Sequence, residues 1–258
     1  MSHSCATQPT QLVSAFASRV LDAISPVERN LVDVVILAAG LGTRLRPYTE
    51  TTPKPLLPVQ GRPILDRIIG ALPKVERLVV VVNYLAEQVE AYLSQQTHIP
   101  VERCSTVRQA VPRGTGDALM SCRDHIQADR VMVLNGDDLY GASDLAQLAQ
   151  YPAGLLAHEV EEPRKFGIVF PRADGTLERL VEKPDLDGRQ LANIGAYLFP
   201  RSVFECDLPL SPRGEYEITD AVSLIAAREP FHVVRAQFWL PIGDVPAWQA
   251  AQHANLDG

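Results

Sequence analysis

The chain has 258 residues, of which 24 are Lys or Arg and 31 are Asp or Glu, so its formal net charge is −7. With 46% hydrophobic and 21% charged residues it can form a sizeable core, which excludes disordered, collagen-like and coiled-coil proteins. The length suits one large α/β domain or two small ones. The acidic balance argues against nucleic acid or an anionic membrane as the main partner, although a local cationic pocket for a phosphate remains compatible with it.

The sequence shows no pattern typical of a membrane span or a secretory signal. The longest apolar stretches, 34–41 and 78–82, are much shorter than the roughly 18 to 20 residues that a membrane span needs. The first 20 residues lack the basic head and continuous apolar block of a secretory signal. The four cysteines show no C-x-x-C spacing, which predicts neither a zinc site nor a disulfide framework. We therefore expect a cytoplasmic protein without membrane contact.

Residues 1–31 differ from the rest of the chain in the pattern of their apolar residues. Their apolar residues recur at helical spacing until Pro26 ends the run, which predicts an N-terminal helical extension. We expect this extension to pack on the body of the protein or on a second subunit of a homo-oligomer. Residues 32–258 are interpreted as one domain, because no linker rich in Gly, Ser or Pro divides them.

Strand and helix patterns alternate in the first half of that domain. The predicted elements are a strand at 34–37, a helix at 64–72, a strand at 78–82, a helix at 85–93 and a strand at 131–134. Such alternation is typical of βαβ units. The sequence therefore predicts an α/β fold with a doubly wound, mostly parallel, Rossmann-like sheet and helices on both faces.

The second half is richer in strand patterns. Strands are predicted at 154–158, 167–170, 177–182 and 194–199, a helix at 218–225, an extended segment at 231–238 and a closing helix at 247–256. Gly175 supplies a turn between two of the strands. We interpret this half as a mixed β insertion of the same domain.

A glycine loop follows the first predicted strand. Gly40 and Gly42 allow backbone N–H groups to approach an anion closely, and Arg44 and Lys54 bring cations to the same region. This combination favours phosphate groups over a plain turn, which is the alternative. The chain has no G-x-x-x-x-G-K-[ST] string, and Leu45 stands at the third glycine position of a G-x-G-x-x-G fingerprint, so both common nucleotide motifs are disfavoured.

Residues 37–59 match L-A-x-G-x-G-T-R-L-x-P-x-T-x-x-x-P-K-x-L-x-P-V at nearly every defined place. This segment resembles the signature of the sugar-1-phosphate nucleotidyltransferases, and the resemblance extends from about Asp33 to Leu256. It implies a set of nucleotide-binding residues, namely Leu37, Ala38, Ala39, Gly40, Gly42, Thr43, Gln109 and Gly114. Gln109 and Gly114 lie in a segment that resembles the loop with which the family contacts a pyrimidine base.

The resemblance also implies catalytic residues and a Mg²⁺ ion. Arg44, Lys54, Asp137 and Lys183 are the implied catalytic residues, and Asp137 is the implied Mg²⁺ ligand, whereas Asp138 is expected to point elsewhere. The family motif W-x-D-I-G supplies a second acid, but here the sequence is Trp-Leu-Pro-Ile-Gly with Pro241 in its place. Either Asp244 replaces that acid, or Mg²⁺ relies on Asp137, phosphates and water.

Three segments of the second half resemble the family's sugar-phosphate site. They imply that Gly167, Glu182, Lys183 and Asn193 bind the sugar phosphate. A carboxylate can accept hydrogen bonds from hydroxyl groups, an ammonium offsets phosphate charge, and an amide can donate and accept. The block 214–220 also resembles the family, and we expect a structural role for it.

The resemblance therefore implies transfer of a nucleotidyl group from a nucleoside triphosphate to a sugar 1-phosphate, with release of pyrophosphate. UTP is favoured and dTTP is next, and glucose 1-phosphate is the favoured acceptor, with N-acetylglucosamine 1-phosphate open. Alternatives are a mannose-1-phosphate guanylyltransferase, a phosphocholine-type cytidylyltransferase and a non-catalytic nucleotide-sugar sensor. We expect no second catalytic domain such as the β-helical acyltransferase domain of some relatives.

Overall fold

A computed structural model describes residues 32–256, so the extension expected at 1–31 lies outside the described residues. The centre of the fold consists of four parallel strands in the order β6-β1-β4-β5. They are β1 (Val32–Leu37), β4 (Val75–Val82), β5 (Cys104–Arg108) and β6 (Arg130–Asn135). Their β-branched and aliphatic runs are nearly inaccessible to water in β1, β4 and β6, as expected for parallel strands covered on both faces.

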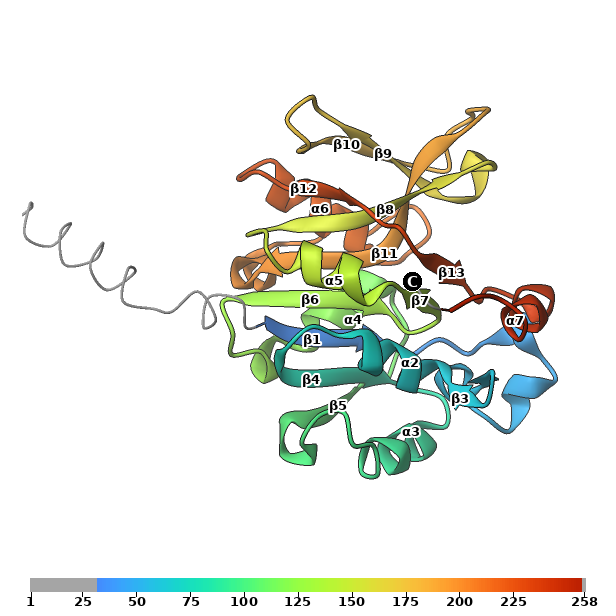
Figure 1. The fold of residues 1–258 in the computed structure, drawn as a ribbon. Helices are drawn as coiled ribbons and strands as arrows, with labels where there is room; N and C mark the ends of the chain where they lie inside the picture. Colours follow the sequence, from blue (N-terminus) through green and yellow to red (C-terminus); the bar gives the residue numbers. More distant parts are fainter. Residues whose placement is uncertain (1–31, 257–258) are drawn as a thin grey trace, which may run out of the picture. The chain divides into compact units, whose positions relative to one another are not determined.

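The C-terminal half extends the same sheet with mostly antiparallel strands. Its strands are β8 (Gly154–Val160), β9 (Gly167–Pro171), β10 (Leu177–Glu182), β11 (Gln190–Pro200) and β12 (His232–Arg235). β11 pairs with β6 through its second half and with β8 mainly through its first half, and the register shifts around Gly195. Within residues 32–256 the nine strands form one sheet, from β10 at one end to β5 at the other (Figure 1).

Helices cover both faces of the sheet. α2 (Ile64–Ala71), α3 (Ala86–Leu93) and α5 (Ala142–Leu148) contribute to one hydrophobic core, and α4 (Thr115–Met120) and α6 (Ile218–Ala226) contribute to the other. Neighbouring residues of β1 alternate between the two cores, with Val34 in the first and Val35 in the second. The predicted doubly wound α/β fold is confirmed.

Two small pairings and a last helix surround this body. β2 (Pro58–Val59) pairs with β3 (Arg62–Pro63), and β7 (Asp138–Tyr140) pairs with β13 (Trp239–Pro241). α7 (Val245–Ala251) contacts the first pairing, since Trp248 Nε1 donates to the Pro58 carbonyl at 2.8 Å. None of the helices in the described part of the chain is long and apolar enough to cross a membrane.

The predicted boundaries at the C-terminal end are wrong in two places. The closing helix spans Val245–Ala251 instead of 247–256, because the Asp244 carboxylate caps it by accepting a hydrogen bond from the Ala247 N–H at 2.9 Å. The extended segment predicted at 231–238 forms two separate strands, β12 and β13, with different partners. The first difference depends on a local cap, whereas the second depends on pairing with distant strands.

Candidate active site

The carboxyl ends of the central strands meet at one edge of the sheet. Leu37 of β1 lies opposite Asn135 of β6 and Val81 of β4. The loops that leave these strands are tied to their neighbours, since Gly136 N–H donates to the Leu37 carbonyl at 3.0 Å and Gln109 N–H donates to the Val82 carbonyl at 3.0 Å. This edge is where open α/β sheets bind ligands.

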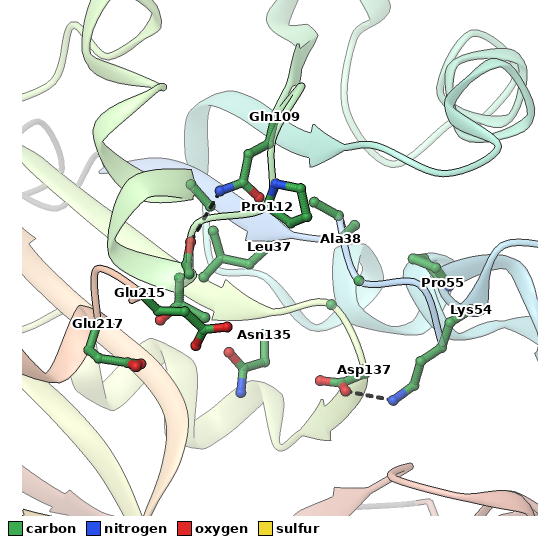
Figure 2. Close-up of a pocket in the computed structure, with 16 residues that line it drawn as sticks. Leu37, Ala38, Lys54, Pro55, Gln109, Pro112, Asn135, Asp137, Glu215 and Glu217 are labelled. Carbon is green, nitrogen blue, oxygen red and sulfur yellow. Dashed lines mark hydrogen bonds and ion pairs between the residues drawn. The ribbon is translucent and has the colours of Figure 1, made fainter. Parts of the chain in front are cut away.

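A cavity of ≈ 370 Å³ opens at this edge. Among the residues predicted to bind nucleotide or metal, it is lined by Leu37, Ala38, Ala39, Gly40, Lys54, Gln109, Gly114 and Asp137. Figure 2 shows Gln109 on one side of the cavity and Lys54 with Asp137 on another. The fold therefore brings most of the predicted nucleotide site together from segments about a hundred residues apart.

The glycine loop exposes a run of backbone donors. The N–H groups of residues 39–44 make no hydrogen bond with any part of the chain that the structure describes. Gly42 has φ +62°, and a Cβ there would lie 2.9 Å from Thr49 Cγ2, so the loop conformation requires glycine. Thr43 and Arg44 form the exposed start of the 3-10 helix Thr43–Leu45. Such an array of free amides is suited to anionic oxygens.

Lys54 and Asp137 form an ion pair with 2.6 Å between Lys54 Nζ and Asp137 Oδ2 (Figure 2). Lys54 is 8% exposed, whereas the Asp137 side chain is 37% exposed. Gly136 lets the loop after β6 pack closely against the end of β1, because a Cβ there would lie 2.7 Å from the Leu37 carbonyl oxygen. A buried ammonium thus lies beside the donor loop and close to an accessible carboxylate.

Asp138, which follows directly, does not line the cavity and is buried. Burial raises the pKa of the Asp138 carboxyl well above its usual range, and the neighbouring Asp137 charge raises it further. Its Oδ2 accepts a long hydrogen bond of 3.4 Å from Asn135 Nδ2. The two adjacent aspartates therefore have different environments, one open to the cavity and one enclosed.

The predicted sugar-phosphate residues lie outside this cavity. Glu182 at the end of β10 pairs with Gly167 of β9, and Lys183 follows with φ +43°. Asn193 Nδ2 donates to the Tyr197 hydroxyl at 2.8 Å. Partial desolvation raises the pKa of Glu182, and the Glu217 carboxylate raises it further. Because Glu217 itself lines the cavity, Glu182 lies electrostatically within reach of it.

Several residues at the cavity were not among those predicted. Asn135, Glu215 and Glu217 line it. The expectation of a purely structural role for 214–220 is therefore incomplete. The sequence of that block shows that Glu215 and Glu217 are acidic, but it does not show that their side chains face the cavity. The glycine loop contributes only part of its residues to the cavity wall. Ala39 and Gly40 line the cavity, whereas Gly42, Thr43 and Arg44 do not.

A family model described as nucleotidyl transferase matches residues 33–258. The chain belongs to this nucleotidyl transferase family. The resemblance found in residues 37–59 is thereby confirmed. Two relatives and one solved structure illustrate how far the similarity extends.

The bifunctional protein GlmU of Methanocaldococcus jannaschii is 32% identical over 216 residues, which cover 82% of this chain and 51% of GlmU. The UTP–glucose-1-phosphate uridylyltransferase AglF of Haloferax volcanii is 33% identical over 226 residues, 82% of this chain and 91% of AglF. A solved UDP-glucose pyrophosphorylase complexed with UDP-glucose superposes with a TM-score of 0.74 at 25% identity, covering 86% and 97% of the two chains. This nucleotidyl transferase thus spans about half the length of the GlmU relatives but most of AglF.

Asp137, Glu215 and Glu217 are the carboxylates that line the nucleotidyl transferase cavity. No group of three or more His, Cys, Asp or Glu side chains within residues 32–256 is arranged to hold a metal. Pro241 pairs with Asp138 across β13 and β7 and offers no side-chain oxygen, and one Asp244 oxygen caps α7. Asp137 remains as an accessible hard ligand beside the donor loop. This arrangement fits Mg²⁺, which often binds through one carboxylate together with phosphates and waters.

Proposed function

We propose that this chain transfers a nucleotidyl group from a nucleoside triphosphate to a sugar 1-phosphate, forming a nucleoside-diphosphate sugar and pyrophosphate. The observation that carries the proposal is the cavity at the carboxyl edge of β1 and β6, where free loop amides, the buried Lys54 ammonium and the Asp137 carboxylate surround one space. Both substrates are anions, so a site that neutralises and aligns phosphates supplies what the reaction needs.

In the proposed reaction an oxygen of the sugar 1-phosphate attacks the α-phosphorus in line. The bond from that phosphorus to the bridging oxygen breaks, and pyrophosphate leaves with the electron pair. A phosphate monoester is already ionised near neutral pH, so the step requires no general base. No covalent enzyme intermediate is needed.

Each group of the chain then has a distinct task. The amides of residues 39–44 and Arg44 hold the β- and γ-phosphates, and Lys54 holds the α-phosphate oxygens. We assign Lys183 to the attacking phosphate, with Gly167, Glu182 and Asn193 orienting the sugar. Asp137 would hold Mg²⁺, which when bound offsets charge on the phosphates. Because its oxygen caps α7, Asp244 is a subsidiary candidate.

UTP is the proposed donor and glucose 1-phosphate the proposed acceptor, with dTTP next. Support comes from the names of AglF and of the solved UDP-glucose pyrophosphorylase, both of which concern uridine nucleotides and glucose. The cavity wall near Gln109 is suited to a base that offers an N–H group.

The deciding experiment is a pyrophosphate-release panel with Mg²⁺. UTP, dTTP, CTP and GTP are each combined with glucose, N-acetylglucosamine and mannose 1-phosphates and with phosphocholine. We expect the fastest release with UTP and glucose 1-phosphate. Absence of release from every pair, together with tight binding of a nucleotide sugar, would instead identify a non-catalytic sensor.

A further inference from the structure

Gln109 is fixed in the cavity wall by almost all of its hydrogen-bonding groups. It is 6% exposed. Its backbone N–H donates to the Val82 carbonyl at 3.0 Å, and its carbonyl accepts from Asn83 Nδ2. Its amide Nε2 donates to the Gly114 carbonyl at 3.1 Å and to Asp117 Oδ2 at 2.9 Å. Oε1 is the one group of Gln109 without a donor in the described chain.

The orientation of this amide follows from the chemistry of its partners. A backbone carbonyl and a carboxylate can only accept hydrogen bonds, so the nitrogen end must face them. Turning the amide by 180° would set Oε1 against two oxygens and lose both bonds. Figure 2 shows the nitrogen along the dashed line and the oxygen at the other end of the amide. Oε1 is also not among the sealed, unpartnered polar side-chain atoms of residues 32–256, so it keeps access to the cavity.

Asp117 is itself held in place. It lies in the first turn of α4, where Oδ1 pairs with Arg113 Nη2 at 2.8 Å while Oδ2 accepts from Gln109. Its side chain is only 16% exposed. Each carboxylate oxygen thus has a separate partner. The oxygen that faces Gln109 can only accept a hydrogen bond from it.

Gly114 adds a donor beside this acceptor. It has φ +101°, and a Cβ there would lie 2.4 Å from the Tyr216 carbonyl oxygen, so only glycine fits. The Gly114 N–H has no partner in the described residues, and Gly114 lines the cavity. The wall therefore offers one acceptor, Gln109 Oε1, and one donor, the Gly114 amide.

We propose that Asp117 is a positioning residue that sets base specificity by fixing the orientation of the Gln109 amide. The family resemblance already implies that Gln109 and Gly114 contact a pyrimidine, and the fixed amide would turn Oε1, beside the Gly114 N–H, toward the imide edge of uracil or thymine. That edge presents a donor at N3 and an acceptor at O4. Cytosine presents the reverse, an acceptor at N3 and a donor at N4, and is rejected. The inference rests on the proposed function, because it requires that a nucleotide base enters this cavity.

The first test uses the unaltered protein. Equilibrium binding of UTP, CTP and N3-methyl-UTP is measured by calorimetry with Mg²⁺ present. Since methylation removes the N3 hydrogen, we expect both CTP and N3-methyl-UTP to bind at least about tenfold more weakly than UTP. Equal binding of UTP and N3-methyl-UTP, or tighter binding of CTP, would overturn the proposal.

The second test changes Asp117. In Asp117→Asn the new amide can turn its NH₂ group toward Gln109, which leaves the Gly114 carbonyl as the one acceptor that still orients the Gln109 amide. We expect the preference for UTP over CTP to fall about tenfold. Asp117→Glu keeps a carboxylate and is expected to retain the preference within about threefold. A purely structural role would weaken both nucleotides equally, and an unchanged ratio in Asp117→Asn would refute the assignment.

Asp66→Asn is the matched control. Asp66 of α2 forms an i,i+4 ion pair with Arg62 of β3, spaced like that of Asp117 with Arg113, but it makes no contact with Gln109. The preference of the Asp66→Asn protein for UTP over CTP should equal that of the unaltered protein. Because binding is measured without turnover, the outcome is separable from the proposed function. Discrimination without pyrophosphate release contradicts only the transfer activity, and release without discrimination contradicts only the role of Asp117.

Discussion

Lys54 is the residue on which the candidate site depends most. Pro53 and Pro55 flank it at the start of the 3-10 helix Lys54–Leu56, and its ammonium reaches Asp137 from a largely buried stem. A buried ammonium is stabilised by a nearby carboxylate and is strengthened as a phosphate ligand by the low local dielectric. Its position between the donor loop and β6 is therefore suited to charge neutralisation at the α-phosphate.

Lys54→Met should lower kcat/KM for the proposed reaction about 10²- to 10³-fold, because one preorganised charge is lost from the site. The fold should persist, since the partly exposed Asp137 carboxylate stays hydrated. Pyrophosphate release gives the rate, and circular dichroism checks the fold. Arg46→Gln is the control, because Arg46 is exposed and does not line the cavity. A folded Lys54→Met protein with a rate within threefold of the original would contradict the assignment.

At the scale of elements, Asp144 of α5 binds the segment that connects β12 to β13. The side chain is 2% exposed, and its Oδ2 accepts hydrogen bonds from the Gln237 and Phe238 N–H groups at 2.9 and 3.0 Å. These residues connect β12 to β13, the strand that contains Pro241. One carboxylate therefore fixes the path of the chain behind the candidate site.

Asp144→Ala should destabilise the protein by about 2 to 4 kcal/mol, because two backbone donors lose their acceptor. Urea denaturation measures the change. Asp144→Asn retains an oxygen that can accept from both donors and should lose less than half as much. Equal midpoints for Asp144→Ala and the unaltered protein would show that water replaces the carboxylate without penalty.

A second element feature is the register shift in β11. Gly195 has φ +75° there, and a Cβ would lie 2.0 Å from Asn135 Nδ2. Gly195→Ala should therefore destabilise the fold by about 1 to 3 kcal/mol and displace Asn135 from the cavity wall. The check is a urea titration together with UTP binding, which should weaken several-fold. Gly175→Ala, also at positive φ but with open space around it, should change stability without changing UTP binding.

At the scale of the whole molecule, buried carboxyl groups couple stability to pH. Burial raises the pKa of Asp138 most clearly, and desolvation also raises the pKa values of Glu182 and Asp220. Below the ordinary aspartate value of about 3.9 both states are protonated. Above it the unfolded chain releases the proton that folded Asp138 retains, so stability falls as pH rises toward the higher folded value.

We therefore expect Asp138 to lower the free energy of unfolding as the pH rises above the ordinary aspartate value, by no more than about 1.4 kcal/mol per pH unit. Asp138→Asn should flatten this dependence, since the amide has a similar shape and does not titrate. Urea denaturation at several pH values in EDTA measures both proteins. Parallel curves for the two would contradict the assignment.

The sequence predicted the parts of the fold in which local pattern and burial agree. β1, β4 and β6 are buried on both faces, so their continuous apolar runs were sufficient. β5 was missed because it lies at the edge of the sheet, where only partial burial is needed and polar residues are tolerated. α4 was missed because its six residues contain a glycine and too few apolar positions to show a period.

For the candidate site, the sequence by itself determined which groups are available, namely a glycine loop, cations and the acid Asp137 at the end of a strand. Only the tertiary structure decided which polar groups meet. It turned Glu215 and Glu217 into the cavity and placed Asp117 where it fixes Gln109. The physical reason is that backbone conformation and local burial follow from neighbouring residues, whereas hydrogen-bond partners depend on how distant segments pack.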